Sequence, residues 1–254
     1  MMPLSILQQI EYRHKSGLKS LTLLIDPDKF DEATCQLYLQ LNAFESANFI
    51  FVGGSLMVGA NMGKTIALLK KHTTKPIIIF PGSSMHIDFQ ADAILFLSLI
   101  SGRNADLLIG QHVIAAPILK KSNLEILPTG YMLVEGGKQT TVSYISNTTP
   151  LPADKPEVAA CTAMAGEMLG LKLIYADAGS GAEKAISPKM VSMLRKSVSL
   201  PIIIGGGIKT VEKAVELWRA GADMLVIGNA VEEDPTFFRV LAQKLAEINH
   251  QEIA

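Results

Sequence analysis

The chain has 254 residues, of which 48% are hydrophobic, and a formal net charge of -1 at pH 7. This length and apolar content suit one large core, so we expect a single domain over residues 1–254. The balanced charge excludes a general attraction to nucleic acid or to an anionic membrane. Two cysteines are too few for a disulfide framework or a thiolate metal site. No apolar run approaches the roughly 18 residues of a membrane-spanning helix, so we expect a cytoplasmic protein.

The first half of the chain alternates strand-length apolar runs with helical patterns. In order, the pattern predicts a helix over 5–15, a strand over 21–25, a helix over 30–44, a strand over 49–52, a helix over 63–72, and strands over 76–80 and 93–97. Only about a dozen residues separate the last two strands, which is near the minimum for a parallel crossover. The helix between these two strands is therefore predicted to be short or irregular.

The second half continues the same alternation. It predicts a helix over 106–119, a strand over 124–134, a helix over 157–169, a strand over 171–175, a helix over 188–197, a strand over 201–204, a helix over 210–220, a strand ending at 227, and a terminal helix from 235. The polar stretch 135–156 contains a glycine pair and three prolines. It is predicted to be a long loop that acts as a lid over the site.

Strands that alternate with helices predict a parallel sheet, and eight of them at fairly even spacing favour a (β/α)₈ TIM barrel over the alternative, a doubly wound sheet. Glycine turns end the last two strands, at Gly205-Gly206-Gly207 and at Gly228-Asn229. Glycine lets the backbone approach a ligand closely, and N–H groups at a helix start attract anions. Because barrels of this class commonly bind phosphate at these two loops, Gly205, Gly206, Gly228 and Asn229 predict a phosphate site. The spacing does not match a dinucleotide fingerprint.

Polar residues follow most of the predicted strands, at the end of the barrel where active sites lie. Asp26 follows the first strand, and Ser55 follows the second on a glycine pair. Magnesium is held by one or two protein oxygens, with water and substrate phosphates completing its shell, so Asp26 and Ser55 predict a magnesium site. The alternative for Asp26 is to cap the next helix, although Asp28 is the better candidate for that cap.

The densest polar cluster follows the sixth strand and contains Tyr175, Asp177, Ser180 and Gly181. The hydroxyl groups can hydrogen-bond a small polyol phosphate, and Asp177 can take a proton from a substrate hydroxyl within hydrogen-bond reach. The alternative is a capped turn in which Asp177 accepts backbone N–H groups. Lys29 offers a positive charge to an anionic substrate.

Several of these motifs, in chain order and over nearly the whole sequence, resemble the geranylgeranylglyceryl phosphate synthase family. They are Leu24-Ile25-Asp26-Pro27-Asp28-Lys29, Phe51-Val52-Gly53-Gly54-Ser55, Phe80-Pro81-Gly82-Ser83, Tyr175-Ala176-Asp177-Ala178-Gly179-Ser180-Gly181, Gly205-Gly206-Gly207-Ile208 and Gly228-Asn229. The Asp-Pro-Asp-Lys motif and the Tyr-x-x-Ala-Gly-Ser-Gly motif are the most specific of them.

The resemblance implies a magnesium-dependent prenyltransferase that joins a polyprenyl diphosphate to the sn-3 hydroxyl of sn-glycerol 1-phosphate. It implies that Asp26 and Ser55 bind the metal. The residues implied to bind glycerol phosphate are Tyr175, Ala176, Asp177, Ala178, Gly179, Ser180, Gly181, Gly205, Gly206, Gly228 and Asn229. One departure is that the family carries glutamate at the position of Asp177, the predicted catalytic base. The shorter side chain would need the substrate or a water to bridge the gap.

A prenyl tail also requires an apolar trough, and the Met- and Ala-rich segments 56–62 and 159–169 are its predicted walls, with core packing as their alternative role. The alternative functions are another phosphate-binding barrel, such as a thiamin phosphate synthase-like transferase or a phosphosugar isomerase, and a non-catalytic barrel that binds a phosphometabolite. Barrels of this kind often associate, so we expect a homo-oligomer. With a lipid product and a neutral surface, we expect at most transient contact with a membrane.

Overall fold

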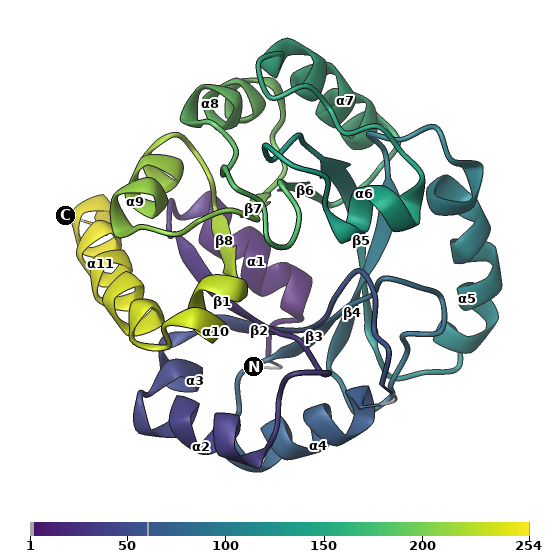
Figure 1. The fold of residues 1–254 in the computed structure, drawn as a ribbon. Coiled ribbons are helices and arrows are strands. Elements are labelled where there is room, and N and C mark those ends of the chain that lie inside the picture. The colour runs from purple at the N-terminus through teal and green to yellow at the C-terminus, as the bar shows by residue number, and fades with distance from the viewer. Residues whose placement is uncertain (1–2, 60, 254) are drawn as a thin grey trace.

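Eight parallel strands close into a barrel, each pairing with the next in chain order and β8 returning to β1 (Figure 1). The structure, a computed structural model, describes residues 3–59 and 61–253. The strands are β1 (Ser20–Ile25), β2 (Phe49–Gly53), β3 (Ile77–Phe80), β4 (Ala93–Leu99), β5 (Glu125–Leu133), β6 (Leu173–Asp177), β7 (Ile202–Gly205) and β8 (Met224–Ile227). The predicted TIM barrel is confirmed, and the doubly wound alternative is wrong.

A ring of helices surrounds the barrel, as Figure 1 shows in a view along its axis. The ring contains α2 (Glu32–Gln40), α3 (Ala43–Ser46), α4 (Met62–His72), α5 (Gln111–Leu119), α7 (Pro156–Met168), α8 (Pro188–Ser197), α9 (Val211–Arg219) and α11 (Thr236–Ile253). Alternate residues of each strand face this ring or the barrel interior, because successive side chains on a strand point to opposite faces. Both faces are buried, which explains why the strands read as continuous apolar runs.

The first helix, α1 (Ile6–Lys15), closes the base of the barrel. Its buried residues Ile6 and Ile10 belong to the same apolar cluster as the interior side chains of the strands. Glu125, at the start of β5, accepts hydrogen bonds from the backbone N–H groups of Ile6 and Leu7 at 2.6 and 2.8 Å. The base is therefore sealed, and the opposite end of the barrel is the one that can admit a ligand.

Two predicted helices differ in the structure. The pattern over 30–44 forms two helices, because Asn42 adopts a left-handed conformation (φ 54°) between α2 and α3. The pattern over 106–119 begins with a π-helical segment, η1 (Asp106–Gly110), that runs directly into α5. Such segments often occur at functional sites.

The two irregular connections were predicted with different success. The helix between β3 and β4, predicted to be short or irregular, is absent: residues 81–92 form only turns, bends and irregular backbone. The stretch 135–156 was predicted to be structureless, which is wrong. It contains α6 (Thr141–Ser146), and a bridge between Val134 and Leu151 joins its two ends. The sequence signal for this helix is the capping box of Thr140 and Ser143. The polar, proline-containing composition of the stretch favoured a loop instead.

No helix among residues 3–59 and 61–253 is both long enough and apolar enough to span a membrane.

Candidate active site

A cavity of about 390 Å³ opens at the C-terminal ends of the strands. Its wall includes residues from the loops after β1, β2, β5, β6, β7 and β8. Of the predicted site residues, those that line it are Asp26, Ser55, Tyr175, Asp177, Ser180, Gly181, Gly206, Gly228 and Asn229. The folded chain thus gathers the predicted metal-binding and phosphate-binding residues around one space.

Four predicted residues do not line the cavity: Ala176, Ala178 and Gly179 of the sixth-strand motif, and Gly205 at the end of β7. Gly179 instead donates its N–H to Asp177. Ala176 and Ala178 are buried in the apolar cluster that includes the helices. Gly205 has no room for a side chain, because a Cβ atom there would lie 2.6 Å from the hydroxyl of Tyr175. These four residues therefore support the wall of the cavity from behind.

Asp177 ends β6 and is almost completely buried, with 6% of its surface exposed. Its Oδ2 accepts a hydrogen bond from the hydroxyl of Tyr131 at 2.7 Å, and its Oδ1 accepts one from the N–H of Gly179 at 2.8 Å. Burial raises the pKa of this carboxyl, and the two hydrogen bonds oppose that rise. The capped turn, which the sequence analysis gave as the alternative to a catalytic role for Asp177, is therefore present. It holds the carboxylate at the cavity wall and leaves lone pairs for a substrate hydroxyl.

The glycine turns present unpaired backbone donors to the cavity. Among the described residues, the N–H groups of Gly206, Gly207 and Gly228 donate no hydrogen bond. The hydroxyl of Ser180 donates to Oδ1 of Asn229 at 2.9 Å, which joins the loop after β6 to the turn after β8. Free N–H groups on neighbouring loops are the arrangement that binds a phosphate.

Gly206 permits a testable prediction, because its φ is +78° and a Cβ atom would lie 2.7 Å from both Asp177 Oδ1 and Gly179 N. We expect Gly206→Ala to lower the free energy of unfolding by about 2–4 kcal/mol, from the left-handed backbone together with the clash. The control is Gly181→Ala, where φ is +73° and the space is open. It should cost only about 1–2 kcal/mol. Urea denaturation measures both, and equal losses would contradict the clash.

Asp26 and Ser55 lie on adjacent strand ends and face the same cavity. Asp26 does not cap a helix: its Oδ1 accepts from the N–H of Asp28 at 3.0 Å, within the turn. Asp28 does not cap one either, because Asp31 is the N-cap of α2. Asp28 instead accepts hydrogen bonds from the N–H groups of residues 58 and 59, which fixes the loop that carries Ser55.

The oxygen atoms of this pair fit magnesium. Among the described residues there is no group of three or more His, Cys, Asp or Glu side chains that could form an all-protein cage. Within the described residues, the hydroxyl of Ser55 makes no hydrogen bond. The one charged group within 4 Å of Asp26 Oδ2 in this part of the chain is Lys29 Nζ, at 3.5 Å. One carboxylate and one hydroxyl, next to a phosphate site, are the limited protein donor set that magnesium accepts.

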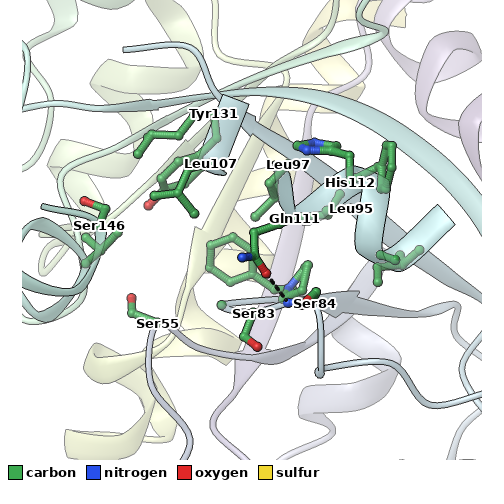
Figure 2. A pocket seen from close by; sticks show the side chains of 18 of the residues that line it. Ser55, Ser83, Ser84, Leu95, Leu97, Leu107, Gln111, His112, Tyr131 and Ser146 are labelled. Atoms are coloured by element: carbon green, nitrogen blue, oxygen red, sulfur yellow. Dashed lines mark hydrogen bonds between the residues drawn. The ribbon is translucent and has the colours of Figure 1, made fainter. Parts of the chain in front are cut away.

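A second cavity, of about 140 Å³, adjoins the first and shares Gly54, Ser55 and Phe80 with it. It lies between strands β3 and β4 and helices η1, α5 and α6, next to the connection that lacks a helix. Figure 2 shows leucine side chains around it, with Gln111 hydrogen-bonded to the N–H of Ser84 at one side. Most of its lining is apolar, including Ile87, Leu95, Phe96, Leu97, Leu99, Leu107, Ala115, Leu119 and Ile145.

Neither predicted wall of the trough lines this apolar cavity. Leu56 lines the polar cavity instead, and Ala60 lies outside the described residues. Segment 159–169 belongs to α7, whose small buried residues Ala159, Ala163 and Gly166 pack against the barrel. Core packing, the alternative role, is the correct one for these small residues, whereas Met168 and Leu169 at the end of the segment are exposed. A spacing pattern could not have found the wall of the apolar cavity, because that wall forms from six separate segments of the chain.

Tyr131 is the main residue of the site that the sequence did not identify. It lines the apolar cavity, while its hydroxyl reaches Asp177 at the polar one. Its ring also contacts Tyr175 and Phe80, with centroids 5.5 and 6.1 Å away. The register between β5 and β6 could have identified it. Tyr131 pairs with Tyr175 on the neighbouring strand, so both rings occupy one layer of the barrel interior.

Comparisons with known proteins identify the family of the chain. A family model described as the PcrB family matches residues 13–249. A geranylgeranylglyceryl phosphate synthase of Spirosoma linguale is 57% identical over 234 residues, which cover 92% of this chain and 94% of the relative. One from Korarchaeum cryptofilum is 38% identical over 223 residues, which cover 88% and 91%.

A solved structure extends the similarity to three dimensions. The crystal structure of (S)-3-O-geranylgeranylglyceryl phosphate synthase from Thermoplasma acidophilum, in complex with its substrate sn-glycerol-1-phosphate, matches with a TM-score of 0.89 and 31% identity, and covers 98% of this chain and 100% of that one. These matches span the whole barrel. They therefore favour this family over the alternative functions, which were those of other phosphate-binding barrels. The chain is a member of the PcrB family, and the two curated relatives described above are geranylgeranylglyceryl phosphate synthases.

Proposed function

We propose that this protein is a magnesium-dependent prenyltransferase that forms an ether between a polyprenyl diphosphate, with geranylgeranyl as the expected chain, and the sn-3 hydroxyl of sn-glycerol 1-phosphate. The observation that carries the proposal is the junction of two cavities. A polar one with unpaired N–H groups and a buried carboxylate meets an apolar one at Ser55 and Phe80. One substrate of this reaction is small and anionic, and the other has a diphosphate head and a hydrocarbon tail.

The glycerol phosphate is assigned to the side of the polar cavity formed by β6, β7 and β8. Its phosphate would accept hydrogen bonds from the free N–H groups of Gly206, Gly207 and Gly228, and its hydroxyl groups would bond Ser180 and Tyr175. Asp177 would accept the proton of the sn-3 hydroxyl. Because burial raises the pKa of Asp177, its carboxylate is a stronger base than an exposed aspartate.

The reaction exchanges one carbon–oxygen bond for another. The sn-3 oxygen bonds to the first carbon of the prenyl chain as its proton passes to Asp177, and the bond from that carbon to the diphosphate breaks with its electron pair leaving on the diphosphate. Lys29, in the same cavity, would offset the negative charge that develops there. Asp26 and Ser55 would hold magnesium, which when bound supplies further positive charge to the departing group.

The apolar cavity is assigned to the prenyl tail, because burying a hydrocarbon chain removes a large apolar area from water. Ala115 lines this cavity from α5, so Ala115→Phe should fill part of it and shift preference from geranylgeranyl towards the shorter farnesyl diphosphate. We expect kcat/KM for the longer donor to fall at least about tenfold relative to the shorter one. Ala116→Phe, on the exposed face of the same helix, is the matched control. An equal effect of both substitutions would contradict the assignment.

The test of the proposal is transfer of label into an organic phase. The protein is incubated with radiolabelled sn-glycerol 1-phosphate and a series of prenyl diphosphates, with and without magnesium, and then extracted. We expect extractable label only when a prenyl donor and magnesium are both present. If no donor moves label, the proposed reaction is wrong, even where calorimetry detects glycerol phosphate binding.

We infer further that copies of the chain associate, and the outer face of η1 and α5 supports this. Ile109, Val113, Ile114 and Ile118 form an apolar row there, each between 46% and 64% exposed. Contiguous exposed apolar side chains are typical of contact surfaces. Light scattering should therefore give a mass that is a multiple of 27.4 kDa, and Ile114→Asp should reduce it. A lone 27.4 kDa species would contradict association.

A further inference from the structure

An ion pair lies in the wall of the polar cavity. Lys29 Nζ, in the turn after β1, lies 2.8 Å from Glu232 Oε2 and 3.5 Å from Asp26 Oδ2. Glu232 belongs to α10 (Asn229–Glu233), the short helix that follows β8. All three side chains line the cavity. Lys29 therefore lies between the carboxylate assigned to the metal and a second carboxylate, which neither the sequence motifs nor the reaction uses.

The position of Glu232 is fixed by the turn assigned to the phosphate of glycerol phosphate. The N–H of Glu232 donates to the carbonyl of Gly228 at 3.3 Å, and Val231 beside it is completely buried. At the start of α10, Asn229 is held by the hydroxyl of Ser180. The carboxylate is thus presented to the polar cavity by an anchored helix.

The charge of Glu232 is unexpected in a cavity that binds two anions, because a carboxylate repels a diphosphate. Its contact with Lys29 resolves the contradiction: a carboxylate oxygen at 2.8 Å occupies the ammonium group as a phosphate oxygen would. The Lys29 side chain is 55% exposed, so the pair is weak enough to exchange for another anion. By comparison, Lys138 and Lys209 line the same cavity and form no ion pair within the described residues.

We propose that Glu232 is a positioning residue that holds Lys29 while the prenyl diphosphate is absent and yields it to a diphosphate oxygen when that substrate binds. The proposal rests on the proposed function. Glu232 then competes with the diphosphate for one ammonium group, so it weakens binding of that group, and it takes Lys29 back when pyrophosphate leaves. The cavity thereby avoids retaining its own product.

Calorimetric titration of inorganic pyrophosphate in the presence of magnesium tests the exchange without turnover. We expect Glu232→Gln to tighten binding about two- to fivefold, and Lys29→Met to weaken it at least about tenfold. In the Lys29→Met background, Glu232→Gln should tighten binding no more than Glu233→Gln does, because only the repulsion between a carboxylate and pyrophosphate remains. The matched control is Glu233→Gln, which removes the same charge from a neighbouring residue that lines the cavity without pairing to Lys29. Circular dichroism verifies that each variant is folded.

Two results would overturn the role of Glu232. One is an equal gain in Glu232→Gln and Glu233→Gln, which would indicate a general charge effect. The other is a gain from Glu232→Gln that is as large in the Lys29→Met background as in the wild type. Lys29→Arg, which keeps the positive charge, should preserve the response to Glu232→Gln. If the variants give either result while the wild-type protein still transfers prenyl groups, the role of Glu232 is wrong and the proposed function stands. If the wild-type protein neither binds pyrophosphate nor transfers prenyl groups, the proposed function and the role of Glu232 are both wrong.

Discussion

Asparagine in place of Asp177 should lower kcat for ether formation about 10²–10⁴-fold, because the amide cannot take the proton of the attacking hydroxyl. The two donors that hold this side chain, the Tyr131 hydroxyl and the Gly179 N–H, stay in place, but one of them then faces an amide nitrogen. Thermal unfolding separates that structural cost from the catalytic one. Asp177→Glu keeps the carboxylate and should retain more activity than Asp177→Asn. Equal loss in both variants would contradict the role of base.

The pH dependence of kcat provides an independent measurement of the same role. Asp177 acts as its carboxylate, so activity should fall as the pH drops through its pKa, which burial raises above the ordinary range of an aspartate. The hydrogen bond from Tyr131 lowers that pKa. Tyr131→Phe should therefore move the acid limb to higher pH, whereas an acid limb that belongs to the substrate phosphate would not move.

Loss of the Asp26 charge is the second change for which we expect a large effect. Asp26→Asn keeps an oxygen that can accept from the N–H of Asp28, so the turn should survive, while the anionic ligand for magnesium is lost. We expect kcat/KM at fixed magnesium to fall about 10²–10³-fold. The magnesium concentration that gives half-maximal activity should rise.

The control for Asp26 is Asp31→Asn, which changes the same charge in the N-cap of α2. Calorimetry of pyrophosphate binding with and without magnesium supplies a readout other than activity. The magnesium-dependent part of the binding should disappear in Asp26→Asn and remain in Asp31→Asn. Unchanged magnesium dependence in the first variant would contradict the metal assignment.

The sequence predicted the strands well, because burial on both faces makes each a continuous apolar run bounded by turn residues. It also predicted which residues meet, since Asp26, Ser55, Asp177 and Gly228 all follow strands and the C-terminal ends of parallel strands meet at one face. Local patterning sufficed for these features. The resemblance added the identity of the substrates, which residue spacing alone does not encode.

The features that the sequence did not reveal depend on contacts between distant segments. Tyr131 reads as one apolar strand residue, and only pairing with β6 brings its hydroxyl to Asp177. The apolar cavity exists because a missing helix leaves β3 and β4 partly uncovered, and α5 and α6 enclose that space. The pair between Lys29 and Glu232 joins residues 203 positions apart. Each requires the closed barrel before it can be recognised.

The most direct test of the central claim is a competition between the two enantiomers of glycerol phosphate. An equal mixture of the sn-1 and sn-3 forms is incubated with geranylgeranyl diphosphate, magnesium and the protein, and the product is identified by mass spectrometry while the unused glycerol phosphate is analysed for its handedness. We expect a geranylgeranyl ether of glycerol phosphate to form, with depletion of the sn-1 form alone. Absence of the ether, or equal consumption of both enantiomers, would contradict the assignment of this cavity to sn-glycerol 1-phosphate prenylation.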